Sequence, residues 1–71
     1  MEFRVDMKLE VLDETQALAT RVPIDVQVIF RAGRWQVQSI EPPFSTVLCE
    51  SMEEALVQAA KEGAGALANA Q

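Results

Sequence analysis

The first twelve residues of the chain alternate between apolar and polar side chains. Apolar residues take the odd positions from Met1 to Val11, and charged residues take the even positions from Glu2 to Glu10. A period of two places the two kinds of side chain on opposite faces of an extended strand. Residues 1–12 are therefore predicted to form a strand with one buried apolar face and one solvated face.

A second alternation runs from Val22 to Phe30, with Ile29 as an apolar residue on the polar face. A two-residue turn at Ala32-Gly33 would join this strand to a third one in an antiparallel hairpin. Most of the cross-strand pairs that this turn implies match apolar with apolar or polar with polar, although one pair brings two arginines together. These pairs are Phe30 with Trp35, Val28 with Val37, Val26 with Ser39, Gln27 with Gln38 and Arg31 with Arg34.

Prolines then interrupt the pattern. In the segment Glu41–Phe44, neither proline can donate a ladder hydrogen bond, so the third strand is predicted to end there. A short fourth strand is predicted at Ser45–Cys49, where β-branched residues recur. Residues 13–20 show no period and are predicted to form a loop with room for one helical turn.

The last third of the chain carries the signals of a helix. Ser51 and Glu54 have the spacing of a capping box, in which each side chain accepts a hydrogen bond from the other residue's backbone amide. Gly63 leaves two outcomes open for residues 63–70: the helix ends near Glu62, or it continues and uses the glycine to approach the sheet closely. Apolar side chains recur at helical spacing as one stripe: Met52, Ala55, Leu56, Ala59, Gly63, Ala66, Leu67 and Ala70.

Together these elements predict a single small α+β domain over residues 1–71. It has a three- or four-stranded antiparallel sheet and one C-terminal helix on one face. A chain of 71 residues buries only about 60% of its unfolded surface, so packing or self-association must support a small core. With one cysteine and no histidine, the chain is expected to hold neither an internal disulfide nor a structural zinc ion, and no cofactor is expected.

Charge and targeting signals narrow the range of partners. Six basic and eleven acidic residues give a net charge of −5, which disfavours nucleic acid and favours a basic protein partner. Arg31 and Arg34 flank the turn, but two charges make a poor phosphate-binding footprint.

The lone cysteine and the lack of a signal peptide indicate a cytoplasmic protein. No apolar run approaches the length of a membrane helix, so no membrane partner is expected.

Cys49 and the Glu53–Glu54 pair come closest to catalytic chemistry. A reactive thiol needs a lowered pKa, whereas the glutamates around Cys49 raise it, and no histidine or second cysteine assists. Adjacent helical residues point about 100° apart, so Glu53 and Glu54 do not converge on one substrate. Cys49 is therefore predicted to be a small buried residue and the chain not to be an enzyme. A small thiol-based enzyme using Cys49 is the alternative.

The second half of the chain resembles the HicB-type antitoxin domain. The resemblance covers about residues 30–62 and rests on the segments GRWQV, EPPF and SMEEALVQAA, where Ser51, Glu53, Glu54 and Ala55 match the pattern that opens the family's helix. It implies a three-stranded antiparallel sheet with one helix. It also implies a small bacterial protein that binds and blocks a basic ribonuclease toxin. The segment PPFSTVLC lacks the glycine-containing stretch usual in that family.

The sequence therefore predicts a small non-catalytic protein-interaction module. If the domain is antitoxin-like, its partner is a basic protein. If the domain is homodimeric, its partner is a second copy of the chain. The expected interaction surface is the unusually uncharged outer face of the sheet together with an aromatic residue beyond it: Gln27, Ile29, Gln36, Gln38 and Phe44.

Overall fold

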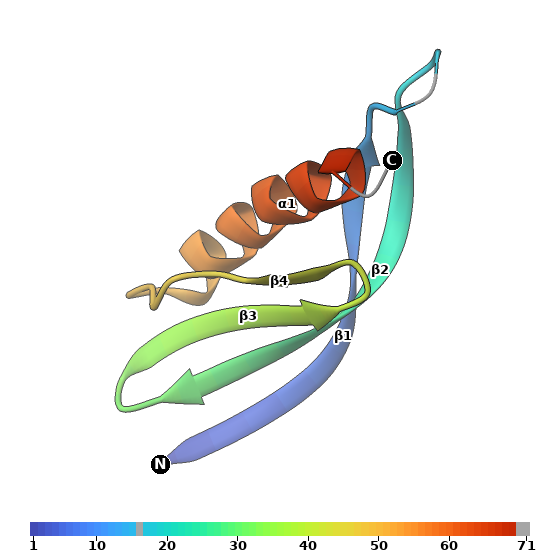
Figure 1. Ribbon diagram of the computed structural model, residues 1–71. Helices are drawn as coiled ribbons and strands as arrows, with labels where there is room; N and C mark the ends of the chain where they lie inside the picture. The colour runs from blue at the N-terminus through green and yellow to red at the C-terminus, as the bar shows by residue number, and fades with distance from the viewer. Residues whose placement is uncertain (16, 70–71) are drawn as a thin grey trace.

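The computed structural model describes residues 1–15 and 17–69. Within these residues the strands form one antiparallel sheet in the order β1-β2-β3-β4, and the helix lies across one of its faces (Figure 1). The predicted α+β fold with a C-terminal helix is confirmed. The elements are β1 (Glu2–Asp13), β2 (Thr20–Arg31), β3 (Arg34–Ile40), β4 (Pro43–Ser45) and α1 (Met52–Asn69).

β1 and β2 form a long ribbon that extends beyond the rest of the sheet (Figure 1). The two strands pair along their whole length, from Glu2 opposite Arg31 to Asp13 opposite Thr20. β3 pairs with only the last five residues of β2, because the ladder between them ends at Gln27 and Gln38. Half of the ribbon is therefore two-stranded and depends on α1 for its cover.

The turn between β2 and β3 has the predicted two residues. Ala32 has a φ of 52° and Gly33 a φ of 76°, so both residues adopt the left-handed conformation of a type I′ turn. Four of the five predicted cross-strand pairs are confirmed, including Phe30 with Trp35. The pairing of Val26 with Ser39 is wrong, because β3 leaves β2 after Gln38 and turns back into β4.

The fourth strand is displaced from its predicted place at Ser45–Cys49. β3 ends at Ile40 as expected, but β4 already begins at Pro43. Beyond β4, Thr46 interrupts the regular ladder because its hydroxyl accepts from the amide of Val37 at 3.0 Å. Trp35 and Cys49 then exchange two backbone hydrogen bonds of 2.8 and 2.7 Å, which hold the segment before α1 against β3.

The core lies between α1 and the sheet. Ser51 caps the helix as predicted, with its hydroxyl accepting from the amide of Glu54 at 3.1 Å. The helix continues to Asn69, and Gly63 is buried against the ribbon; Ala70, in the predicted stripe, lies outside the described residues. The buried cluster consists of Val11, Ile24, Val26, Val28, Val37, Cys49, Ala55 and Ala59.

The apolar face of β1 is only partly covered, which the alternating pattern did not predict. Val11 is fully buried, whereas Phe3, Val5 and Met7 remain 38%, 48% and 36% exposed. A strand of twelve residues is about 40 Å long, and a helix of eighteen residues is about 27 Å long. Because α1 lies over the end of β1 that contains Val11, it leaves the other end uncovered.

Alanine substitutions at two helix glycines should have different effects on stability. Gly65 is exposed and a Cβ there would meet nothing within 4 Å, so Gly65→Ala should raise the free energy of unfolding by about 1 kcal/mol. A Cβ at Gly63 would lie 3.1 Å from Val11 Cγ2, so Gly63→Ala should be at least about 1 kcal/mol less stable than Gly65→Ala. Urea denaturation measures both values. Equal stabilisation would show that the helix does not depend on this close approach.

Candidate protein-interaction surface

β1 forms an open edge of the sheet. Among the described residues no strand lies beside its outer side, and Figure 1 shows the end of β1 near the N-terminus free on that side. The strand is twelve residues long, whereas β4 at the opposite edge has only three. A long edge strand presents a row of unpaired backbone amides and carbonyls that can accept another strand.

An apolar strip runs along this open edge. The uncovered strip consists of Phe3, Val5 and Met7, which point to the same face of the sheet as the core. Aromatic rings in β2 and β3 hold Phe3 in place, with ring centroids 5.3 Å from Phe30 and 5.7 Å from Trp35. The strip is therefore an ordered apolar surface next to unpaired backbone.

The opposite face of β1 carries charges of alternating sign. Lys8 pairs with Asp25 of β2 at 2.8 Å, and Glu2 pairs with Arg31 at 3.0 Å. Glu10 has no ion pair among the described residues, so its carboxylate is free to meet a partner. The open edge thus joins an apolar strip on one face to a row of alternating charges on the other.

The glutamines predicted to form an interaction surface bond to their neighbours instead. Gln27 accepts from Arg4 at 3.2 Å and from Gln38 at 3.0 Å. Gln36 donates to the hydroxyl of Ser45 and to a backbone carbonyl of the next residue, both at 3.0 Å. The structure brings these three glutamines together on the outer face, as the sequence predicted, but their amides are largely occupied within the chain.

Two members of the predicted surface are not exposed on the outer face. Ile29 is only 4% exposed, so the expectation of an exposed isoleucine is wrong: it lies between Arg4 and Gln36 on the neighbouring strands, and their long side chains cover it. Phe44 pairs with Ser39 on the other face of the sheet and packs against the core. The outer face is therefore a bonded polar layer, and the exposed apolar surface lies on the face that carries α1.

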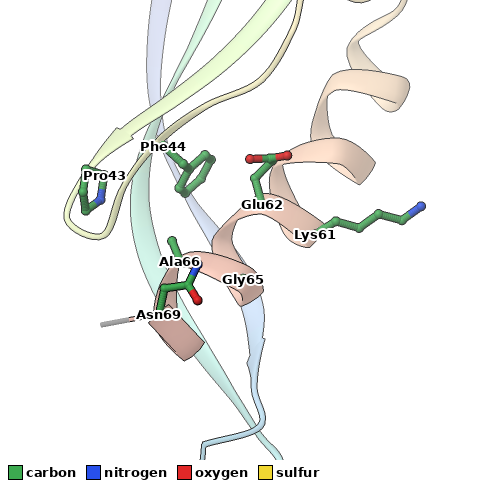
Figure 2. Close-up of a pocket in the computed structure, with 7 residues that line it drawn as sticks. All are labelled: Pro43, Phe44, Lys61, Glu62, Gly65, Ala66 and Asn69. Atoms are coloured by element: carbon green, nitrogen blue, oxygen red, sulfur yellow. The ribbon is translucent and has the colours of Figure 1, made fainter. Parts of the chain in front are cut away.

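A groove separates β4 from the C-terminal half of α1. Its volume is about 550 Å³, and Figure 2 shows the ring of Phe44 directed toward the helix while Lys61 extends away from the groove. Besides Lys61, the lining consists of one aromatic ring, a proline, small helical residues, the amide of Asn69 and the carboxylate of Glu62. Those groups supply neither a nucleophile nor a paired acid and base.

A second, open hollow of about 700 Å³ lies where β3 leaves β2. Ser39 is one of its lining residues, and the hydroxyl of Ser39 is buried without a hydrogen-bond partner among the described residues. Lys8 and Asp25 at its rim already pair with each other. Within residues 1–15 and 17–69, no three histidine, cysteine, aspartate or glutamate side chains gather closely enough to hold a metal ion.

Cys49 is a buried packing residue, as predicted. Its side chain is 2% exposed, and its thiol donates to the carbonyl of Val47 at 3.4 Å. Burial raises the pKa of the Cys49 thiol, and the nearby carboxylate of Glu54 raises it further. A thiol in these surroundings stays protonated near neutral pH and is shielded from reagents.

The negative charge of the chain is concentrated on the side that carries α1. Residues 50–69 contain four glutamates and one lysine, a net of −3 out of the total of −5. The outer face of the sheet carries both signs. The surfaces around the helix and behind the sheet therefore differ in charge.

No family model, curated protein or solved structure matches this chain. Among the described residues, no helix is long and apolar enough to cross a membrane. The interpretation of the surface therefore rests on its own geometry and chemistry.

The sequence does not predict the uncovered strip, because the alternation assigns Phe3, Val5 and Met7 to the buried side of the strand. One signal could have revealed it. The first strand is predicted to be longer than the helix that must cover it, so part of its apolar face had to remain exposed. Only the structure shows which end that is.

The thiol of Cys49 should be slow to react in the folded protein. At a pH of about 8.5, a disulfide reagent such as Ellman's should modify it at least about tenfold more slowly in buffer than in concentrated urea. Because the folded pKa is raised above the unfolded one, the free energy of unfolding should also fall as the pH rises through this range. Equal rates in buffer and in urea would contradict the burial of this thiol.

Proposed function

We propose that this chain is a non-catalytic protein-interaction domain that associates with itself through the open edge of β1. The observation that carries the proposal is the uncovered strip of Phe3, Val5 and Met7 beside unpaired backbone. Edge strands pair readily with another strand, since main-chain hydrogen bonds provide affinity and alternate side chains provide specificity. A second strand at this edge would satisfy the backbone and reduce the exposure of the strip.

The size of the domain supports the same proposal. A core of eight buried residues is small, and chains of this length gain stability by association. Partner binding to the folded state stabilises it by mass action, so dimerisation would raise the apparent stability of the domain.

The proposed domain is a bacterial, cytoplasmic and non-catalytic one. Its cysteine is free and buried, which is usual for proteins kept in a reducing compartment and supports a cytoplasmic location. The raised pKa of this thiol supports a role without catalysis. The resemblance of residues 30–62 to HicB-type antitoxin domains supports a bacterial origin.

Two matched valine substitutions test the proposed self-association. Val5 is 48% exposed in the strip, and Val47 is 65% exposed just after β4, at the opposite edge of the sheet, so lysine at either position should leave the fold intact. Val5→Lys should weaken dimerisation at least about tenfold, because it places a charge in the apolar contact. Val47→Lys should leave dimerisation unchanged.

Sedimentation equilibrium over a range of protein concentrations measures the dissociation constant of each variant. A wild-type chain that remains monomeric at the highest soluble concentration would contradict the proposed function. Equal effects of the two substitutions would place the contact away from β1.

The charge distribution favours a second candidate function, which is binding of a basic protein in an antitoxin-like way. Most of the net negative charge lies around α1, with Glu50 and Glu53 both exposed there. Such a surface attracts a positively charged partner and speeds its association. α1 packs on the core face of the sheet, whereas the unpaired backbone of β1 points outward at the edge, so this contact is compatible with a paired β1.

Charge reversal on the helix tests this second candidate. A tagged wild-type chain should retain a small basic protein from its source cells in a fixed ratio, and added salt should release it. Glu53→Lys should lose that protein, whereas Glu14→Lys in the loop between β1 and β2 should keep it. Retention by the Glu53→Lys variant would contradict an acidic binding surface on α1.

A further inference from the structure

We propose that two copies of this chain pair antiparallel through β1 around a two-fold axis at Met7, which joins their sheets into one of eight strands. The inference rests on the proposed self-association and assigns its geometry. Among the described residues, β1 has a free outer side and the longest run of alternating side chains at any edge of the sheet.

The alternation of β1 limits the registers that two copies can adopt. Residues that lie opposite each other in an antiparallel pair point to the same face of the sheet. An axis that passes between two residues would set apolar side chains of one copy against charged side chains of the other. Only an axis that passes through a residue brings the two apolar faces together.

The charges exclude half of the remaining registers. With the axis at Asp6, Arg4 of one copy would face Lys8 of the other, and with the axis at Lys8, Asp6 would face Glu10. Like charges directly opposite each other are destabilising. With the axis at Met7, Arg4 faces Glu10 and Asp6 faces Lys8, so every facing pair of charges attracts, and each pair occurs twice.

Axes at Phe3 and Leu9 each match only one kind of charged pair and leave more of β1 unpaired than an axis at Met7. An axis at Val5 matches two kinds, so other observations must distinguish it from Met7. It would use Glu2, which already pairs with Arg31 at 3.0 Å within the chain. The axis at Met7 uses Glu10, which has no ion pair among the described residues. It also pairs β1 along nearly its full length and so forms more backbone hydrogen bonds.

The helix provides the third reason for an axis at Met7. In this register Phe3 of one copy lies opposite Val11 of the other, and Val11 packs under α1 against Gly63. The uncovered strip of each copy would therefore lie next to α1 of the other copy. The flank of α1 opposite the β4 groove is apolar and half-buried, with side chains at helical spacing: Leu56, Ala60, Ala64 and Leu67.

A charge swap tests the facing pair of Arg4 and Glu10. Glu10→Arg should weaken dimerisation at least about tenfold, because both attractive pairs become repulsive. Adding Arg4→Glu should restore the dissociation constant to within about threefold of the wild-type value. Glu62→Arg on α1 makes the same change in net charge and should leave dimerisation unweakened. Failure of the second substitution to restore the dimer would overturn the register.

Single cysteines test the position of the axis directly. Opposite residues in either kind of antiparallel pair are close enough for a disulfide, so Met7→Cys should cross-link into a dimer under mild oxidation. Val5 would face Leu9 of the other copy and lie about 13 Å from its own equivalent, so Val5→Cys should not cross-link. Leu18→Cys, 80% exposed in the loop between β1 and β2, controls for random collision, and the native Cys49 is buried.

These results separate the geometry from the proposed function. Faster cross-linking of Val5→Cys than of Met7→Cys would move the axis to Val5 and overturn the inference. A wild-type dimer in which neither cysteine cross-links and the charge swap fails would refute the register but not self-association. A monomeric wild-type chain would contradict both.

Discussion

The close contact between Gly63 and Val11 governs how the molecule is arranged. Because residue 63 has no side chain, α1 can rest directly on the far end of the β1–β2 ribbon, where Ile24 completes the contact. That placement closes the core over a two-stranded part of the sheet. It also draws the helix away from the other end of β1. The buried core and the uncovered strip are thus two results of one approach between helix and strand.

Features encoded by neighbouring residues could be predicted from the sequence. The strand alternation, the Ala32-Gly33 turn and the Ser51 cap each depend on a few adjacent positions, and the structure has all three. How much of β1 the helix covers could not be predicted, because no local pattern specifies where a helix packs on a longer strand. For that reason Phe3 is expected to be buried but is exposed, and Ile29 is buried although its position faces outward.

The candidate interaction surface could also be predicted only in part from the sequence. The sequence correctly places the outer glutamines on one face, but it does not show that Gln27 bonds to Arg4 and Gln38. Those bonds depend on register across three strands. The alternating charges of β1 are visible in the sequence, yet their meaning depends on β1 lying at an edge. In a central strand the same charges would meet neighbours within the chain, whereas at an edge they can select one pairing register over another.

The position of α1 on a single face has a consequence for any paired form. Joining two sheets edge to edge extends the sheet without turning either copy over, so both helices would lie on the same side. The acidic surface around α1 would then be displayed twice, in a fixed two-fold arrangement. A partner with two matching basic sites could engage both at once, and the second contact would form at a high effective concentration. Modest affinity at each helix would become strong and selective binding to symmetric or repeated partners.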